Sequence, residues 1–372
     1  MRLFYIFSID YQLISHRKDV VAAAVRNGYE VTVVAADTGF RKEIEGMGVR
    51  FINLPINRVG TNPKEELRTL RFLYKLYRKE KPDMVHHISI KVTLWGGLAA
   101  KLAHVPRVVN AINGLGVLFE NGEVDTITKR IFMKLVQYAH HRENVLTIFQ
   151  NDQDRDFFVT RGIINPNQIR RINGSGVNLE IFQETPATTC YPLKMLFTSR
   201  MIEEKGVLDI IKAAKILQPN YQDKICFILC GLLETNPNAV SKEILDEACD
   251  GKYIKYLGQR TDVIELLKEA AVVLLPSYYR EGIPKSLIEA TAIGRPIITT
   301  DWVGCKEVVV DTLNGFLIPI KSPKQLAEKI ALLADNEAMR IAMGKESRKI
   351  AVAKFSIEEV INRHLKIYQE LS

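Results

Sequence analysis

The chain has 372 residues, of which 47% are hydrophobic and 25% are charged, a composition typical of a globular protein with enough chain for two domains. Every apolar stretch is shorter than the roughly 18 residues that a membrane-spanning helix needs. The net charge of +8 is uneven, because residues 1–175 hold 26 Lys and Arg against 17 Asp and Glu. This imbalance favours an anionic partner for the first half of the chain.

Short apolar runs that predict strands alternate with amphipathic stretches that predict helices along most of the chain. In the first half the predicted strands are 3–8, 30–36, 84–88, 107–112 and 145–150, and the predicted helices are 17–27, 64–81, 92–103 and 126–142. After a Gly-, Pro- and Thr-containing linker at 170–194, the predicted strands are 194–199, 225–231, 253–258, 272–276, 296–300 and 315–319. The helices of this half are 206–217, 241–249, 262–269, 284–294, 322–334 and 337–353, and a last helix follows at 356–372.

This alternation predicts an α/β protein with two Rossmann-like domains, each built on a parallel sheet. We expect the first domain to span residues 1–180 and the second to span 185–354, with the last helix crossing back to the first domain. Ligands bind beyond the carboxyl ends of the strands in such sheets, so the two domains are expected to face a cleft.

The stretch YYREGIPKSLIEATAIG (278–294) places two carboxylates around the start of a predicted helix. Glu281 lies on the loop before this helix and Glu289 lies inside it, with Pro284 at the expected first helical position. Carboxylates accept hydrogen bonds from pairs of hydroxyl groups, and the free N–H groups of a helix start bind anions. The pattern predicts a site for a hydroxylated, anionic ligand. A solvated loop followed by a helix salt bridge is the alternative interpretation.

Two cations follow the predicted strand 194–199. Arg200 and Lys205 flank a short loop that opens the next helix at Gly206. Arg grips phosphate oxygens as a fork and Lys adds a point charge, so the pair could neutralise a diphosphate. An ordinary surface Arg and Lys are the alternative, but a Lys in a first helical turn is electrostatically unfavourable, which favours function.

Taken together, these stretches resemble the second domain of the retaining, GT-B-fold glycosyltransferases of family four. The similar segments are SRMIEEKG (199–206), REGIPKSLIEA (280–290) and GRPIITTDWVGCKEVV (294–309). Four further segments resemble the first domain and hinge of that family: residues 15–34, 81–89, 105–119 and 172–182. Within the family, the greatest similarity is to bacterial polysaccharide-assembly N-acetylgalactosaminyltransferases that act on polyprenyl-diphosphate-linked sugars.

The resemblance implies that Arg200 and Lys205 hold the diphosphate of a nucleotide-sugar and stabilise it as it leaves. It also implies that Glu289 accepts hydrogen bonds from the ribose and that Glu281 contacts the donor sugar, so Arg200, Lys205 and Glu281 are the candidate catalytic residues. The other implied donor-site residues are Gly231, Gln259, Arg260, Gly282, Ile283, Pro284 and Lys285. The implied donor is a UDP-sugar, no metal or other cofactor is expected, and the leaving phosphate is expected to take the acceptor's proton.

Two departures from the family pattern lie on the acceptor side. Many members carry a glycine-rich loop after the first strand, where this chain has SIDYQLISHR (8–17), so Ser15 and His16 become acceptor-side candidates. Many members carry a His-Gly pair after the fifth strand, where this chain has Asn113 and Gly114. Asn exchanges hydrogen bonds but cannot carry a proton. His86 is the remaining acceptor-side candidate.

Metal and redox chemistry find little support. The segment NDQDRD (151–156) contains two Asp-x-Asp triplets, but it opens a helix directly after a strand, where Asn and Asp are ordinary caps. No Gly-x-Gly-x-x-Gly follows the first strand, which argues against a dinucleotide oxidoreductase. The five cysteines are an odd number without disulfide-framework spacing, so we expect free thiols in a cytoplasmic protein.

The predicted helix 64–81 carries a basic stripe beside an apolar face. Arg68, Arg71, Lys75 and Arg78 repeat at helical spacing, an arrangement that can rest on an anionic membrane surface. An ordinary amphipathic helix with solvated cations is the alternative. With the lipid-linked acceptor that the resemblance implies, we expect peripheral association with the inner face of the cell membrane and no nucleic-acid partner.

The expected activity is therefore transfer, with retention of configuration, of N-acetylgalactosamine or a related hexose from a UDP-sugar to a polyprenyl-diphosphate-linked saccharide in polysaccharide assembly. Two alternatives remain open. A nucleotide-sugar 2-epimerase shares the architecture but would need acid–base carboxylates in the cleft. A non-catalytic subunit of an assembly complex would tend to lose the donor-site residues, and these are intact.

Overall fold

The computed structural model describes residues 1–57, 62–116, 119, 126–234 and 238–372. The chain divides into unit 1, which is Met1–Ser175 with Ile357–Ser372, and unit 2, which is Gly176–Ser356. The border between the units lies inside the predicted linker, and the C-terminal helix belongs to unit 1. Each unit is built on its own parallel sheet, so the predicted class of two Rossmann-like α/β domains is confirmed.

Unit 1 has a seven-stranded sheet in the order β3-β2-β1-β4-β5-β6-β7, and all of its strand pairs are parallel. Its strands are β1 (Arg2–Ile9), β2 (Glu30–Ala36), β3 (Arg50–Asn53), β4 (Met84–Ile88), β5 (Arg107–Ile112), β6 (Val145–Phe149) and β7 (Ile169–Arg171). Its helices are α1 (Asp10–His16), α2 (Lys18–Arg26), α3 (Arg41–Glu45), α4 (Pro63–Glu80), α5 (Ile90–Leu102), α6 (Ile127–His140), α7 (Asp152–Val159) and α14 (Ile357–Glu370).

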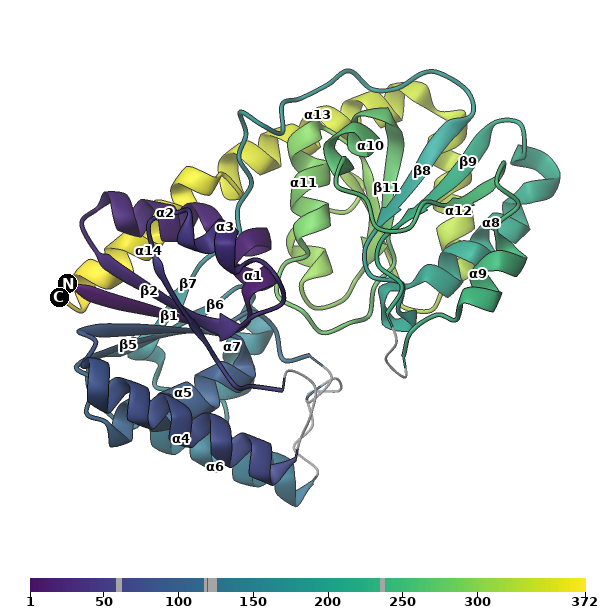
Figure 1. Ribbon diagram of the computed structural model, residues 1–372. Coiled ribbons are helices and arrows are strands. Elements are labelled where there is room, and N and C mark those ends of the chain that lie inside the picture. Colours follow the sequence, from purple (N-terminus) through teal and green to yellow (C-terminus); the bar gives the residue numbers. More distant parts are fainter. Residues whose placement is uncertain (58–61, 117–118, 120–125, 235–237) are drawn as a thin grey trace. The chain divides into compact units, whose positions relative to one another are not determined.

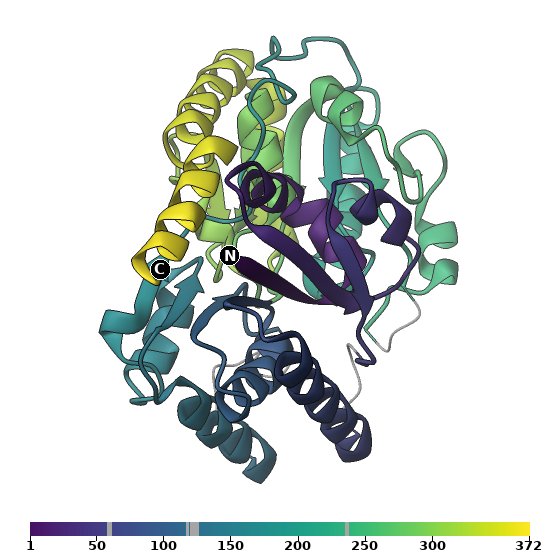
Figure 2. The ribbon, with the colours of Figure 1, turned by 60° about the vertical axis from the view of Figure 1, so that its left-hand side comes forward.

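Helices cover both faces of this sheet, which explains why its central strands are almost continuously apolar. One face packs against α2, α3 and α14, and the other packs against α4, α5 and α6 (Figure 1). On α14 the buried side chains recur at helical spacing and include Val360, His364, Ile367 and Tyr368. Figures 1 and 2 show the two ends of the chain side by side in unit 1.

Unit 2 has a six-stranded parallel sheet in the order β10-β9-β8-β11-β12-β13. Its strands are β8 (Leu193–Thr198), β9 (Ile225–Cys230), β10 (Ile254–Tyr256), β11 (Ala270–Leu275), β12 (Ile297–Thr300) and β13 (Gly315–Ile318). Its helices are α8 (Val207–Tyr221), α9 (Lys242–Ala248), α10 (Val263–Glu269), α11 (Lys285–Ile293), α12 (Pro323–Asp335) and α13 (Glu337–Lys354), with the 3-10 turns η3 (Glu203–Lys205) and η4 (Cys305–Glu307). Figure 1 shows α8 and α12 on one face of this sheet and α10, α11 and α13 on the other.

The strand order locates the ligand-binding edge of each unit. In unit 2 the order reverses between β8 and β11, and in unit 1 it reverses between β1 and β4. Loops leaving the carboxyl ends of the two strands at such a switch point diverge to opposite faces and leave a crevice, where ligands of open α/β sheets bind. In unit 2, the loop after β8 therefore lies beside the loop after β11.

The sequence pattern missed several short elements. β3 and β7 have four and three residues, too few to show an alternation, and α1 and α3 are also short. The helix expected at 17–27 is α2, and the unexpected α1 precedes it; the two meet at Arg17, whose φ of −136° separates them. Among the described helices, none combines the length and apolar character needed to span a membrane.

Candidate functional site

The loop after β8 holds the first of the two predicted cations. Arg200 lies two residues beyond the end of β8, where its guanidinium donates to Glu234 Oε1 at 3.1 Å. The guanidinium also lies 5.3 Å from the ring centroid of Tyr279, in cation–π geometry. Burial on its own would lower the pKa of Arg200, but the Glu234 carboxylate and Tyr279 raise it.

Lys205 ends the 3-10 turn η3 and is the more buried cation, with 4% of its surface exposed. Its ammonium forms an ion pair with Glu281 Oε1 and lies 5.3 Å from the centroid of the Tyr279 ring. The structure thus brings Arg200 and Lys205 to one aromatic ring, which the sequence pattern had not singled out, and joins Glu281 to them through Lys205.

A backbone carbonyl fixes the loop after β11 in this position. The Glu204 carbonyl accepts hydrogen bonds from Tyr278 N at 2.8 Å, Tyr279 N at 3.1 Å and Ser277 Oγ at 3.1 Å. Because Glu204 lies in η3, these bonds join the two loops that leave the switch point of the sheet. The relative positions of Lys205 and Glu281 therefore depend on backbone contacts as well as on their own ion pair.

Glu289, the second of the two predicted carboxylates, lies inside α11, as expected. Its carboxylate is 3.2 Å from Lys285 Nζ, and its side chain is 13% exposed. Burial raises the pKa of Glu289 above its ordinary value, and Lys285 opposes this rise. Pro284 is the N-cap residue of α11 rather than its first helical residue, and no side chain of a described residue caps this helix start.

Two glycines allow backbone segments to approach each other at this edge. A Cβ atom on Gly231, whose φ is +154°, would lie 1.7 Å from the Ser199 carbonyl oxygen. A Cβ on Gly304, whose φ is +83°, would lie 1.7 Å from the carbonyl oxygen of Gly282. No other residue fits at either position, so both glycines are needed to hold the loops as they are.

The remaining donor-site candidates lie on or beside these loops. Gln259 and Arg260 are exposed after β10, where Arg260 forms a two-pronged pair with Asp262 at 2.8 and 2.6 Å. Gly231 follows β9 and its carbonyl accepts a hydrogen bond from Tyr256 Oη at 2.9 Å. Gly282, Ile283 and Pro284 form the buried end of the loop before α11.

In unit 1, a buried carboxylate organises the loop that replaces the glycine-rich loop of the family. Asp10 accepts hydrogen bonds from the backbone N–H groups of Tyr11 at 2.7 Å, Thr38 at 2.8 Å and Phe40 at 3.0 Å, and from the Thr38 hydroxyl. Burial alone would raise the pKa of Asp10, but these hydrogen bonds outweigh it and lower the pKa. Asp10 is thus a structural residue that ties the start of α1 to the loop after β2.

The predicted acceptor-side residues of unit 1 have different environments. Ser15 and His16 lie at the end of α1, where His16 is exposed and the Ser15 hydroxyl donates to Tyr11 O at 2.7 Å. Asn113 and Gly114 follow β5 and are half-buried. Of the resembling segment 105–119, Val117 and Leu118 lie outside the described residues.

The expectation that His86 faces the acceptor is not met. His86 is completely buried on β4, and its Nδ1 lies 2.8 Å from the Tyr368 hydroxyl of α14. Its ring also packs 5.7 Å from the ring of His364. The reason is that α14 returns to cover this face of the sheet, which the local pattern around β4 does not reveal.

The Asp-x-Asp segment is a helix cap, as its position after a strand predicted. Asn151 is the N-cap residue of α7 and its side-chain oxygen accepts from Asp154 N at 2.7 Å. The described residues contain no group of three or more His, Cys, Asp or Glu side chains arranged to hold a metal ion.

Matches to family models agree with this arrangement. The model described as "Glycosyl transferases group 1" matches residues 187–350, and the model described as "Glycosyl transferase 4-like" matches residues 5–151. Together with the two parallel-sheet domains, these matches define the chain as a glycosyltransferase with the GT-B fold. It belongs to family four of these enzymes.

Curated relatives resemble the chain over most of its length. It is 27% identical over 389 residues to the N,N'-diacetylbacillosaminyl-diphospho-undecaprenol alpha-1,3-N-acetylgalactosaminyltransferase of Campylobacter jejuni, covering 100% of this chain and 99% of that protein. It is 27% identical over 356 residues to the UDP-Gal:alpha-D-GlcNAc-diphosphoundecaprenol alpha-1,3-galactosyltransferase of Escherichia coli, covering 92% and 89%. Its fold matches Anabaena Alr3699/HepE, solved in complex with UDP-glucose, with a TM-score of 0.76, 18% identity and coverage of 100% and 99%.

Proposed function

We propose that this enzyme transfers a sugar from a UDP-sugar to a polyprenyl-diphosphate-linked saccharide. The observation that carries the proposal is the pair of cations Arg200 and Lys205 at the ring of Tyr279, with Glu281 bound to Lys205, at the switch point of the unit 2 sheet. Two cations with an adjacent carboxylate suit a ligand that has both a diphosphate and a hydroxylated ring. The two relatives are both named for transfer to diphospho-undecaprenol-linked sugars, which supports the choice of acceptor.

In this proposal, unit 2 holds the donor. Arg200 and Lys205 neutralise the diphosphate, and the uncapped N-terminus of α11 adds a positive dipole end. Glu289 accepts hydrogen bonds from the ribose hydroxyls and Glu281 accepts from the donor sugar. The donor sugar is N-acetylgalactosamine or a related hexose, since one relative is named for N-acetylgalactosamine transfer and the other for galactose transfer.

The chemical step we propose retains the configuration of the anomeric carbon. The bond between this carbon and the UDP oxygen breaks, and the acceptor hydroxyl oxygen bonds to the carbon from the same face. The acceptor's proton passes to the departing phosphate oxygen. Arg200 and Lys205 then stabilise the negative charge that develops on UDP, which is the main work assigned to the protein, and no metal is required for it.

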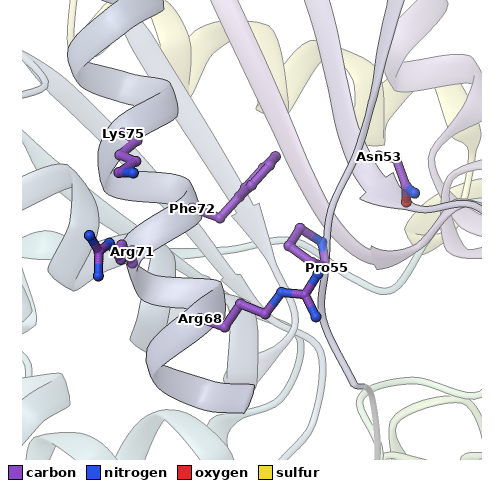
Figure 3. A pocket seen from close by; sticks show the side chains of 6 residues that line it. All are labelled: Asn53, Pro55, Arg68, Arg71, Phe72 and Lys75. Carbon is purple, nitrogen blue, oxygen red and sulfur yellow. The ribbon is translucent and has the colours of Figure 1, made fainter. Parts of the chain in front are cut away.

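We further propose that unit 1 meets an anionic membrane surface at the inner face of the cell membrane, with α4 as one contact. Arg68, Arg71 and Lys75 are exposed and form no ion pair with a described residue. They line a pocket of about 370 Å³ together with Asn53, Pro55 and Phe72. Figure 3 shows Arg68 reaching from α4 towards Pro55, with Phe72 between the helix and the neighbouring segment.

The outer face of α6 has features that suit the same membrane contact. Ile127, Ile131 and Tyr138 are 76%, 53% and 52% exposed, and they lie on one side of the helix with the exposed cations Arg130 and Lys134. The helix contains no Asp or Glu. Both α4 and α6 pack on α5, so their outer faces belong to the same layer of unit 1. Exposed apolar side chains mixed with unpaired cations suit an interface of acyl chains and anionic headgroups.

Nucleotide binding tests the donor half of the proposal. Thermal unfolding would be followed with UDP, GDP, ADP and CMP, each at about 100 times its expected dissociation constant, where binding adds about 2.7 kcal/mol. The proposal predicts stabilisation by UDP alone and its loss in Arg200→Ala. Stabilisation by another nucleotide instead would contradict the UDP assignment.

Product analysis separates the transferase from the 2-epimerase. A 2-epimerase would convert a UDP-sugar without any acceptor, whereas a transferase would release stoichiometric UDP only when the acceptor is present.

A further inference from the structure

Arg17 is an unusual residue because its guanidinium is buried without a carboxylate partner. It lies at the junction of α1 and α2 and is 2% exposed. Its Nη1 donates to the His16 carbonyl at 3.1 Å, and its Nη2 contacts Asn113 Oδ1 at 3.4 Å. No Asp or Glu among the described residues forms a salt bridge with it. A buried charge that lacks an opposite charge lowers stability, so its presence calls for another explanation.

Arg17 also acts electrostatically on a polar cluster of His86, His364 and Tyr368, where β4 meets α14. Its Nε has no hydrogen-bond partner among the described residues, and the same is true of Nε2 of His86 and Nε2 of His364. Burial and, to a smaller extent, the charge of Arg17 lower the pKa of His364 to about 3. Burial likewise lowers the pKa of Arg17 to about 10, which still leaves it charged at neutral pH. The guanidinium is thus near enough to His86 and His364 for its charge to lower their pKa values, and it contacts Asn113 directly.

This arrangement fixes the orientation of the Asn113 amide. A guanidinium can only donate hydrogen bonds, so the Asn113 atom that faces it must be the carbonyl oxygen. The same oxygen accepts a hydrogen bond from Gln150 Nε2 at 3.1 Å. With both donors on Oδ1, the amide nitrogen Nδ2 points elsewhere, and it donates to no described residue of the chain.

We propose that Arg17 is a positioning residue that turns the Asn113 amide so that its NH₂ group donates to an oxygen of the sugar substrate. Asn113 follows β5 at the carboxyl edge of the unit 1 sheet, the edge at which ligands of such sheets bind. The inference rests on the proposed glycosyl transfer. Beyond that function, we infer that Asn113 presents a hydrogen-bond donor of fixed direction to the substrate. Arg17, which is buried and lies nearly a hundred positions earlier in the chain, sets this direction.

A double-mutant cycle in the transfer reaction tests this role. Arg17→Met removes the donor and the buried charge together, and we expect kcat to fall roughly tenfold to a hundredfold, since small misplacements of a substrate-contacting group have effects of this size. In an Asn113→Ala background, Arg17→Met should change kcat by less than about twofold, because the group that it positions is absent. Equal losses in both backgrounds would overturn the proposal.

A substitution at Asn113 separates the two ends of its amide. Asn113→Asp keeps an oxygen for Arg17 and Gln150 and replaces the outward NH₂ donor by an acceptor. We expect this variant to raise the thermal unfolding midpoint, since it gives the buried guanidinium a carboxylate, and to abolish transfer. Retention of wild-type kcat in Asn113→Asp would contradict a donor role for Nδ2.

The matched control is Arg340→Met in unit 2. Arg340 is 1% exposed and donates to the carbonyls of Leu333 at 2.6 Å and Ala334 at 3.0 Å. We expect this variant to lower the unfolding midpoint without changing kcat per folded molecule. Arg17→Met should do the reverse, with an unchanged or higher midpoint and a lower kcat, because its loss removes an uncompensated charge.

The unfolding data also separate this inference from the proposed function. If the wild type transferred no sugar from any UDP-sugar, the proposed function would fail. The gain in midpoint from Asn113→Asp should still disappear in an Arg17→Met background. Persistence of the gain there would show that Arg17 does not face Asn113, whatever the activity of the enzyme.

Discussion

The Lys205 ammonium and the Glu281 carboxylate form an ion pair across the loops that follow β8 and β11. The Lys205 side chain is 5% exposed and that of Glu281 is 22% exposed, so the pair is mostly shielded from water. Removing one member of a shielded pair leaves the other charge without compensation. In the proposed enzyme the diphosphate of the donor is a second anion for Lys205, and Glu281 is then available to the donor sugar.

Substitution of Lys205 by Ala is expected to reduce both stability and UDP binding. The unfolding free energy should fall by roughly 2 kcal/mol, less than for a fully buried pair because Glu281 is partly solvated. Denaturant unfolding and calorimetric titration with UDP would measure the two effects. In Lys205→Ala/Glu281→Ala the loss of stability should be smaller than the sum of the single losses. Additive losses would contradict the coupling of the two side chains.

Substitution of Glu289 by Gln is expected to raise the stability of the protein and to weaken UDP binding. Its pKa is raised in the folded protein, chiefly by burial, so this carboxyl favours folding at pH values below its unfolded pKa and loses that contribution as pH rises through its folded pKa. Glu289→Gln should therefore be more stable than the wild type at pH 7, with a difference that shrinks towards pH 4.5, and it should bind UDP more weakly. Thermal unfolding across this pH range checks the first statement. If the stability of the wild type instead rose relative to that of Glu289→Gln with increasing pH, the pKa of Glu289 would be lowered in the folded protein, contrary to this account.

Asp10 is expected to stabilise unit 1 through the loop after β2. Its folded pKa is lowered by hydrogen bonds, so its contribution is present above its unfolded pKa and is lost as pH falls through the folded pKa. Asp10→Asn should cost about 1–3 kcal/mol at pH 7, the range for leaving buried donors without a partner. Asp37→Asn is the control, because the carboxylate of exposed Asp37 accepts, among the described residues, only from Gly39 N at 3.0 Å. Equal effects of the two changes would show that Asp10 does not organise this loop.

Gly304 is expected to be needed for donor binding because only a residue without a side chain lets its backbone lie against that of Gly282. In Gly304→Ala the new Cβ would meet the Gly282 carbonyl oxygen and displace the loop that carries Glu281. Gly251→Ala is a matched control in the same unit, since Gly251 also has a positive φ (+73°) but nothing lies within 4 Å of its Cβ position. We expect both variants to lose about 1 kcal/mol from the backbone conformation and only Gly304→Ala to lose UDP binding. Isothermal titration of both variants with UDP makes the comparison.

The basic face of unit 1 is expected to determine membrane binding. Replacing Arg68, Arg71 and Lys75 by Glu should weaken binding to anionic vesicles at least roughly a hundredfold, at about 1 kcal/mol for each cation near the surface. Co-sedimentation with vesicles of anionic and of zwitterionic lipid measures this. A control with the same change in net charge replaces the exposed lysines Lys242, Lys252 and Lys345 of unit 2 by Glu. Equal weakening in both triple variants would show that net charge, rather than this face, controls binding.

The residues proposed to bind the donor could be singled out from the sequence because each lies in a short contiguous motif. Arg200, Lys205, Glu281 and Glu289 are set by a strand end and a helix start, and local patterns determine both. Tyr279 could have been noticed as an aromatic residue inside the same loop. Its role depends on two cations about 75–80 positions earlier in the chain, which only the strand order β8-β11 brings beside it.

The surroundings of the acceptor-side candidates were harder to predict because their contacts are distant in sequence. His86 looked like a candidate because nothing near β4 indicates that α14 covers it, some 280 residues later. The contact of Arg17 with Asn113 and the hydrogen bonds of Asp10 also join segments that share no local pattern. The fold class followed from the alternation of apolar strands with amphipathic helices, whereas short elements such as β3 and β7 carry too few residues to show a period.

The most direct test of glycosyl transfer is the mass and configuration of the product. Wild-type protein would be incubated with UDP-N-acetylgalactosamine, UDP-galactose or UDP-glucose and a short-chain polyprenyl-diphosphate-linked saccharide, with Lys205→Ala in parallel. We predict that the lipid gains one sugar residue, joined in the same anomeric configuration that it had in the donor, and that Lys205→Ala forms little of this product. Conversion of the UDP-sugar to an isomer without acceptor, or an unchanged lipid with all three donors, would contradict the proposed function.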